Sequence, residues 1–137
     1  MKYDIIFHVD SEDEAPLKLA LTQAVNYKKE AVLNKRKISP LDIAINAGAG
    51  ALETPDPFHV VVVVNGPAVK LLTQEHEDLL GKAQEAVANG VKFHAGAYAM
   101  KKYNIEPSRL WTFVEVVPSA TFDIVELQHQ GYAYVKP

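Results

Sequence analysis

Residues 59–67 read His59-Val60-Val61-Val62-Val63-Val64-Asn65-Gly66-Pro67, and this stretch decides the fold. A strand that is apolar at every position has both faces covered, which is typical of the parallel sheets of α/β proteins. The following Asn-Gly-Pro is typical of a helix start, because asparagine caps helices and proline fits their first position. The stretch therefore predicts a buried parallel strand that leads directly into a helix.

The same alternation extends over most of the chain. Runs rich in β-branched and aromatic residues predict four more strands, at 3–9, 91–94, 111–117 and 132–135. Between these runs, apolar residues recur at helical spacing, first at Leu17, Ala20, Leu21, Ala24 and Val25. Further helices or helical turns are predicted at 68–73, 79–88, 97–102, 107–110 and 120–130. Alternating strands and helices predict a three-layer α/β/α domain with a mostly parallel sheet.

One segment, from about 30 to 57, does not follow this pattern. Residues 41–45 alternate like a short strand, and 47–51 read Ala-Gly-Ala-Gly-Ala before two prolines. The two glycines lack the third glycine and the following helix of a dinucleotide-binding loop. A long connection in a compact domain is usually functional, oligomeric or disordered. The segment is therefore interpreted as an insertion that forms an oligomer arm, a lid or a disordered loop.

Composition limits the function. The 137 residues fit one domain, 1–137, and the net charge of −3 is not that of a typical nucleic-acid binder. No secretion signal is visible, and the longest apolar run is too short to span a bilayer, so we expect a cytoplasmic protein with no nucleic-acid or membrane partner. The chain has no cysteine, which excludes disulfides, thiolate metal sites and a cysteine nucleophile.

Polar residues and glycines gather where the predicted strands end. Ligands of open parallel sheets bind beyond the carboxyl ends of the strands, where glycines allow close approach and helix amides favour anions. Lys136, after the last strand, is a weaker candidate for neutralising an anion. The predicted ligand-binding residues are His8, Asp10, Asn65, Gly66, His94, Gly96 and Tyr98.

Other interpretations of these residues stay open. A histidine at a strand end is often a structural residue, and the glycines could serve only to make tight turns. Metal binding by His8, Asp10 and His94 lacks supporting ligand spacing, so we predict no metal and no cofactor. No serine lies in a Gly-x-Ser-x-Gly turn, so we predict no catalytic residue. An enzyme that uses His94 or His8 as general acid or base remains an alternative.

The chain resembles the DsrE/DsrF-like family in several segments. They are Ile5–Asp10, Val60–Val69, Gly90–Phe93, Ile105–Pro107, Val114–Pro118 and Gln130–Pro137. The resemblance implies a five-stranded, mostly parallel sheet of order 4-3-2-1-5. It also implies a homo-oligomer, commonly a trimer or hexamer, and a link to intracellular sulfur transfer.

In the sulfur-relay members of this family, a cysteine just after the third strand accepts sulfur as a persulfide. The resemblance places that position at Gly96, which cannot hold sulfur. It therefore implies a module that binds a small polar or anionic ligand, or another protein, and not a cysteine-dependent sulfurtransferase. His8 and His94 would contact the ligand, and Tyr98 would close the pocket. A non-catalytic assembly subunit of a sulfur-relay complex is a further alternative.

Overall fold

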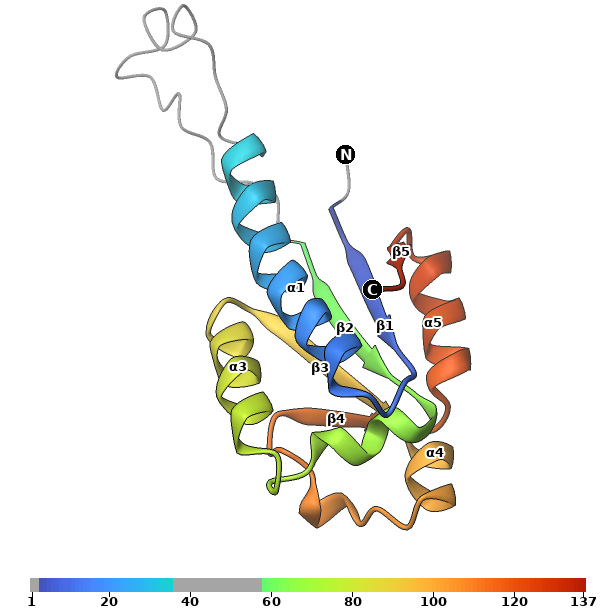
Figure 1. Cartoon of the computed structure of the whole chain (residues 1–137). Coiled ribbons are helices and arrows are strands. Elements are labelled where there is room, and N and C mark those ends of the chain that lie inside the picture. Colours follow the sequence, from blue (N-terminus) through green and yellow to red (C-terminus); the bar gives the residue numbers. More distant parts are fainter. Residues whose placement is uncertain (1–2, 36–57) are drawn as a thin grey trace, which may run out of the picture.

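The sheet has five strands, all parallel, in the order β4-β3-β2-β1-β5. The computed structural model describes residues 3–35 and 58–137 (Figure 1). The strands are β1 (Ile5–Val9), β2 (Val60–Val64), β3 (Val91–Gly96), β4 (Val114–Val117) and β5 (Ala133–Val135). The α/β class expected from the sequence and the strand order implied by the resemblance are both confirmed.

Helices cover both faces of the sheet and complete three layers. One face packs against α1 (Glu14–Lys35) and α3 (Glu77–Ala88), and the other packs against α5 (Ala120–His129). Three shorter elements follow the carboxyl ends of strands or connect them: η1 (Gly66–Leu72), α4 (Ala97–Lys102) and η2 (Pro107–Arg109). No helix among the described residues combines the length and apolar character needed to cross a membrane.

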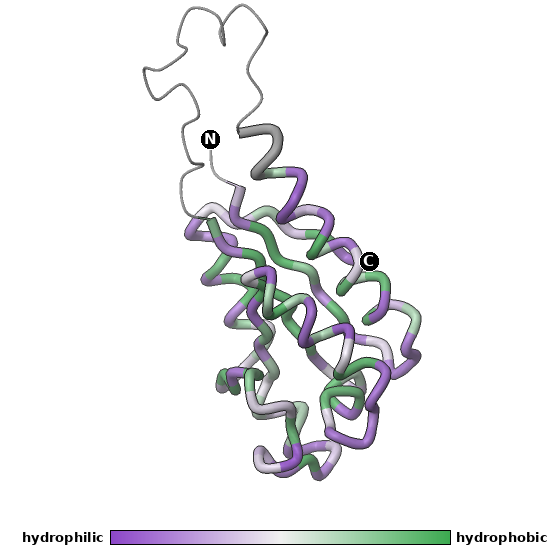
Figure 2. The backbone as a smooth tube through the Cα atoms, turned by 90° about the vertical axis from the view of Figure 1, so that its left-hand side faces the viewer, coloured by the Kyte–Doolittle hydropathy of each residue, from purple (hydrophilic) through white to green (hydrophobic). Residues whose placement is uncertain are grey.

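The valines of β2 form the centre of the core. Val60, Val62 and Val64 face the layer of α1 and α3, whereas Val61 and Val63 face α5. All five are at most 2% exposed, and complete burial of such a side chain contributes about 1.5–3 kcal/mol. Figure 2 shows hydrophobic stretches running through the interior and hydrophilic residues frequent along the surrounding helices and loops.

Three element boundaries differ from those expected. The first helix continues to Lys35, and β3 continues to Gly96 because Ala95 and Gly96 pair with β4. The fourth strand begins at Val114 and not at Trp111. The backbone N–H of Trp111 donates to Leu72 O and its indole Nε1–H donates to Thr73 O, so this residue joins η1 and not the sheet. The predictions for residues 36–57, including the glycine-rich stretch and the short strand, fall outside the described residues.

Candidate functional site

The two predicted histidines lie in one row across the sheet. The register pairs His8 with Val63, Val63 with His94, and His94 with Glu115. Side chains at paired positions of parallel strands point to the same face, here the one covered by α5. Two strand spacings separate the histidine backbones by about 10 Å. The row is therefore a shared surface, but the two imidazoles do not touch.

His94 is held between two carboxylates of its own chain. Its Nδ1 lies 2.8 Å from Asp123 Oδ2 on α5, and its Nε2 lies 3.3 Å from Glu115 Oε2 on β4. The side chains of His94 and Asp123 are only 12% and 14% exposed, whereas that of Glu115 is 71% exposed. The contact with Asp123 is a hydrogen bond that joins β3 to α5. His94 thus fixes α5 to the sheet, and a ligand would have to displace a carboxylate to reach it.

His8 has one nitrogen that is not engaged. Its Nδ1 lies 2.6 Å from the Tyr134 hydroxyl of β5, while its Nε2 is buried and has no hydrogen-bond partner. Burial lowers the pKa of His8, the nearby Asp10 carboxylate opposes this, and Lys136 adds to the lowering. The imidazole is therefore inclined to be neutral, with one nitrogen as donor and the other as acceptor. An unsatisfied buried polar atom is uncommon and calls for a partner.

Asp10 and Lys136 form an ion pair beside His8. Lys136 Nζ lies 2.9 Å from Asp10 Oδ2, and the two side chains are about half exposed. This hydrogen bond lowers the pKa of Asp10 and raises that of Lys136. The charge that Lys136 was expected to offer to an anion is thus balanced by Asp10, and a bound anion would compete with that carboxylate.

Asn65 caps the turn into η1. Its backbone N–H donates to Val9 O at 2.9 Å, and its side-chain Oδ1 accepts from the Gly66 N–H at 2.8 Å. Gly66 has a φ of +56°, a left-handed conformation that favours glycine. These two backbone donors are thus engaged within the fold. The expectation that Asn65 and Gly66 offer amide groups to a ligand stays a prediction.

Gly96 is packed closely against the start of α5. It ends β3 and caps α4, and a Cβ built on it would lie 3.0 Å from both the Cβ and the backbone nitrogen of Ala120 on α5. The position that the resemblance aligns with a sulfur-accepting cysteine is thus in close contact with the start of α5. Tyr98, expected to close a pocket, is 74% exposed on α4.

Three residues that engage the predicted site were not predicted from the sequence. They are Asp123, Glu115 and Tyr134, which contact the two histidines. Tyr134 and Glu115 could have been found from strand register, since the parallel order places them beside β1 and β3. Asp123 carried no such signal, because its contact depends on how α5 is seated.

A recess lies next to this region, between α4 and β4. It has a volume of about 280 Å³, and its lining includes Ala97, Met100, Ile105 and Val116 but none of the seven predicted residues. Across residues 3–35 and 58–137, no group of three or more histidines and carboxylates is placed to hold a metal ion. The alternative of a metal site from His8, Asp10 and His94 thus gains no support.

Solved structures share this fold. The chain is similar to MTH1491 from Methanobacterium thermoautotrophicum, a protein of unknown function, with 24% identity, a TM-score of 0.70, and 99% of this chain and 100% of that chain covered. It is also similar to BT1422 from Bacteroides thetaiotaomicron, likewise of unknown function, with 11% identity, a TM-score of 0.66, and coverage of 98% and 94%. The ychN protein from E. coli matches at 12% identity and a TM-score of 0.52, with coverage of 98% and 100%.

These identities establish the shared fold and no shared activity. No curated protein matches the chain. The family model described as DsrE/DsrF-like matches residues 4–137, which is nearly the whole sequence. The strand order agrees with that expected of the family. The chain therefore belongs to the DsrE/DsrF-like family.

Proposed function

We propose that this DsrE/DsrF-like protein reversibly binds a small polar or anionic ligand beside His8, in the cytoplasm, and does not carry sulfur covalently. The observation that carries the proposal is the buried, unpartnered Nε2 of His8. If the Tyr134 hydroxyl donates to Nδ1, then Nε2 carries the proton and is a hydrogen-bond donor without an acceptor. A small anion would supply that acceptor.

The neighbouring groups suit such a ligand. Lys136 is 54% exposed and lies at the same strand ends, so its ammonium can turn from Asp10 toward a bound anion. Asp10 gives up this partner at a cost, which restricts binding to ligands that replace the lost hydrogen bond. The absence of cysteine and the close packing of Gly96 against α5 support reversible contacts over covalent sulfur transfer.

NMR of ¹⁵N-labelled histidine side chains tests this proposal directly. Sulfate, phosphate and thiosulfate would be titrated while the Nε2 resonance of His8 is followed. We expect a saturable shift with at least one anion, and we expect a His8→Gln variant to bind it about tenfold more weakly, a loss of about 1.4 kcal/mol. His129→Gln, which changes an exposed histidine on α5, is the matched control and should leave binding unchanged.

Two outcomes would contradict the proposal. A His8 resonance that stays unchanged at millimolar concentrations of all three anions would contradict the binding of an anion beside His8. Covalent sulfur found by intact mass spectrometry, after exposure to a persulfide donor and gel filtration, would contradict the reversible mode of action.

We propose self-association as a second function of the surface, because α5 has an exposed apolar side. Phe122 and Val125 are 62% and 44% exposed and lie one turn apart on this helix. The family resemblance implies trimers or hexamers, and an exposed apolar helix face is a suitable contact between copies. Native mass spectrometry should find an oligomer that Phe122→Glu dissociates. A monomer would contradict self-association. An oligomer that forms only with a cysteine-bearing relative would favour the assembly-subunit alternative.

The enzyme alternative is less well supported by the geometry. A general acid or base needs a nitrogen within reach of the substrate, and both nitrogens of His94 face carboxylates. If an activity is found, His94→Ala separates the two cases. Loss of turnover without loss of ligand binding would support the alternative that the protein is an enzyme.

A further inference from the structure

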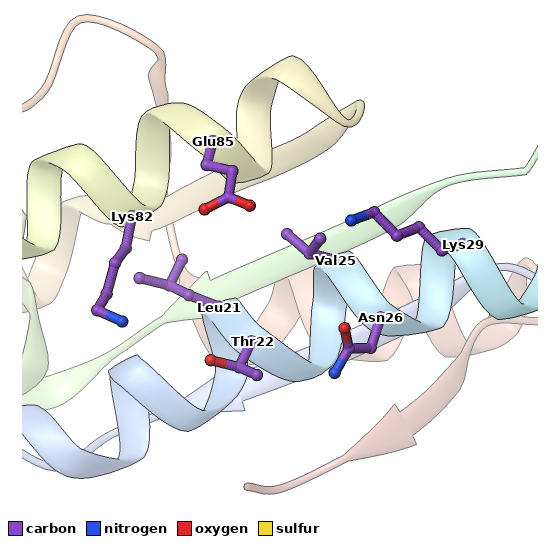
Figure 3. Close-up of a pocket in the computed structure, with 7 residues that line it drawn as sticks. All are labelled: Leu21, Thr22, Val25, Asn26, Lys29, Lys82 and Glu85. Carbon is purple, nitrogen blue, oxygen red and sulfur yellow. The ribbon is translucent and has the colours of Figure 1, made fainter.

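A groove between α1 and α3 lies on the face of the sheet opposite the histidine row. Its volume is about 240 Å³, and Figure 3 shows the side chains that line it. Those on α1 are Leu21, Thr22, Val25, Asn26 and Lys29, and those on α3 are Lys82 and Glu85. The groove thus lies on the other side of the sheet from His8 and is lined by a different set of polar and charged side chains.

Its apolar and charged parts are clearly divided. Leu21 and Val25 are 2% and 8% exposed and belong to the core, so they form an apolar floor. Lys29 and Lys82 lie toward opposite ends of the groove, and the Glu85 carboxylate lies between them (Figure 3). The charges along the groove therefore run positive, negative, positive.

None of these three charged groups forms an ion pair with a described residue. Some lysines of the fold do so, since Lys18 lies 3.2 Å from Glu14 and Lys70 lies 3.1 Å from Glu12. Lys82 and Glu85 are three positions apart on α3, a spacing that permits a pair, yet none is formed. The three groups are thus left available to a ligand from solution.

We propose that this groove binds a small amino dicarboxylate, a molecule with two carboxylates and one amine on a short carbon chain. The carboxylates would contact Lys29 and Lys82, the ammonium would contact Glu85, and the carbon chain would lie on Leu21 and Val25. Thr22 and Asn26 add hydrogen-bonding groups along one side. The volume lies below the 300–1,000 Å³ or so of drug-sized sites, which fits a ligand of amino-acid size.

Titration of ¹⁵N-labelled protein with L-aspartate and L-glutamate tests the proposal. At least one of them should shift the backbone amides of 21–29 and 82–85 saturably. Lys29→Ala and Lys82→Ala should each weaken binding about tenfold. Lys101→Ala, which removes an exposed lysine on α4, should have no effect. Succinate and glutarate, which lack the amine, should bind more weakly than the matching amino acids.

The role of Glu85 has its own variant. In Glu85→Gln, the amino acid and its amine-free analogue should bind alike, because the partner of the amine is gone. No saturable response to either amino acid would overturn the proposal. So would equal binding of the analogues by the unaltered protein, or binding that survives both lysine substitutions. These amide readouts lie on α1 and α3, so they are independent of the outcome at His8.

Discussion

Replacement of Gly96 by alanine tests whether the position that the resemblance aligns with a sulfur-accepting cysteine can take a side chain. The added Cβ would lie 3.0 Å from both the Cβ and the backbone nitrogen of Ala120. Carbon atoms in optimal contact are about 3.5–4.0 Å apart, so β3 or α5 must move by a few tenths of an ångström. Overpacking of a well-packed interior costs about 1–3 kcal/mol. We expect Gly96→Ala to lose stability by this amount.

Urea unfolding monitored by circular dichroism measures the loss in the free energy of unfolding. Thermal unfolding provides a second measure: at about 3–4 °C per kcal/mol for a domain of this size, the melting temperature should fall by about 3–12 °C. Gly81→Ala is the matched control, because no heavy atom lies within 4 Å of the Cβ that it would add within α3. This variant should gain about 0.5–1 kcal/mol, since alanine is the better helix residue.

A double variant isolates the contact itself. Ala120→Gly removes the Cβ that meets the new side chain but leaves the backbone nitrogen in place, so it should recover part of the stability lost in Gly96→Ala. A Gly96→Ala protein as stable as the unaltered chain would refute the reasoning. It would mean that α5 yields at no cost and that a cysteine could be accommodated at this position.

Three further outcomes are expected. His94→Ala should lower the free energy of unfolding in urea by about 1–3 kcal/mol, because the largely buried Asp123, 14% exposed, loses its imidazole partner. If the same substitution costs little in a protein that already carries Asp123→Asn, the pairing is confirmed. The pKa of His8 is lowered from its ordinary value of 6.5, so as the pH falls the unfolded chain is protonated before the folded one, and stability should fall below about pH 6.5. His8→Gln should remove this pH-dependent loss of stability. The same pH profile in the variant and the unaltered protein would contradict the assignment to His8. Trp111→Phe should cost about 1–3 kcal/mol by thermal unfolding, because a buried backbone carbonyl loses its indole donor; an unchanged melting temperature would contradict this.

The sequence predicted the sheet well because burial determines it. The valine run of β2 can only be a central strand, and each neighbouring strand has its own β-branched or aromatic run. The boundary errors at Trp111 and Gly96 arise from contacts between elements. Whether Trp111 pairs in the sheet or with η1 depends on the position of Thr73, which no local pattern encodes.

The candidate site was predicted less fully than the fold. The sequence placed His8 and His94 at one edge of the sheet, where their strands end. That they also share a face follows from the parallel register and was not predicted. What these histidines contact could not be predicted, since Asp123 reaches His94 from a helix that lies elsewhere in the sequence. The α1–α3 groove also escaped notice, because its lysines look like ordinary solvated residues until the two helices are placed side by side.

The pairing of β1 has a consequence for biosynthesis. One neighbour of β1 is β2, but its other neighbour is β5, from the opposite end of the sequence. During translation, the unpaired edge of β1 must wait until nearly all of the domain has emerged from the ribosome, and such edges invite association with other chains. The Tyr134 partner of His8 arrives with the same strand, so a nascent or truncated chain would have the imidazole without the hydroxyl that orients it.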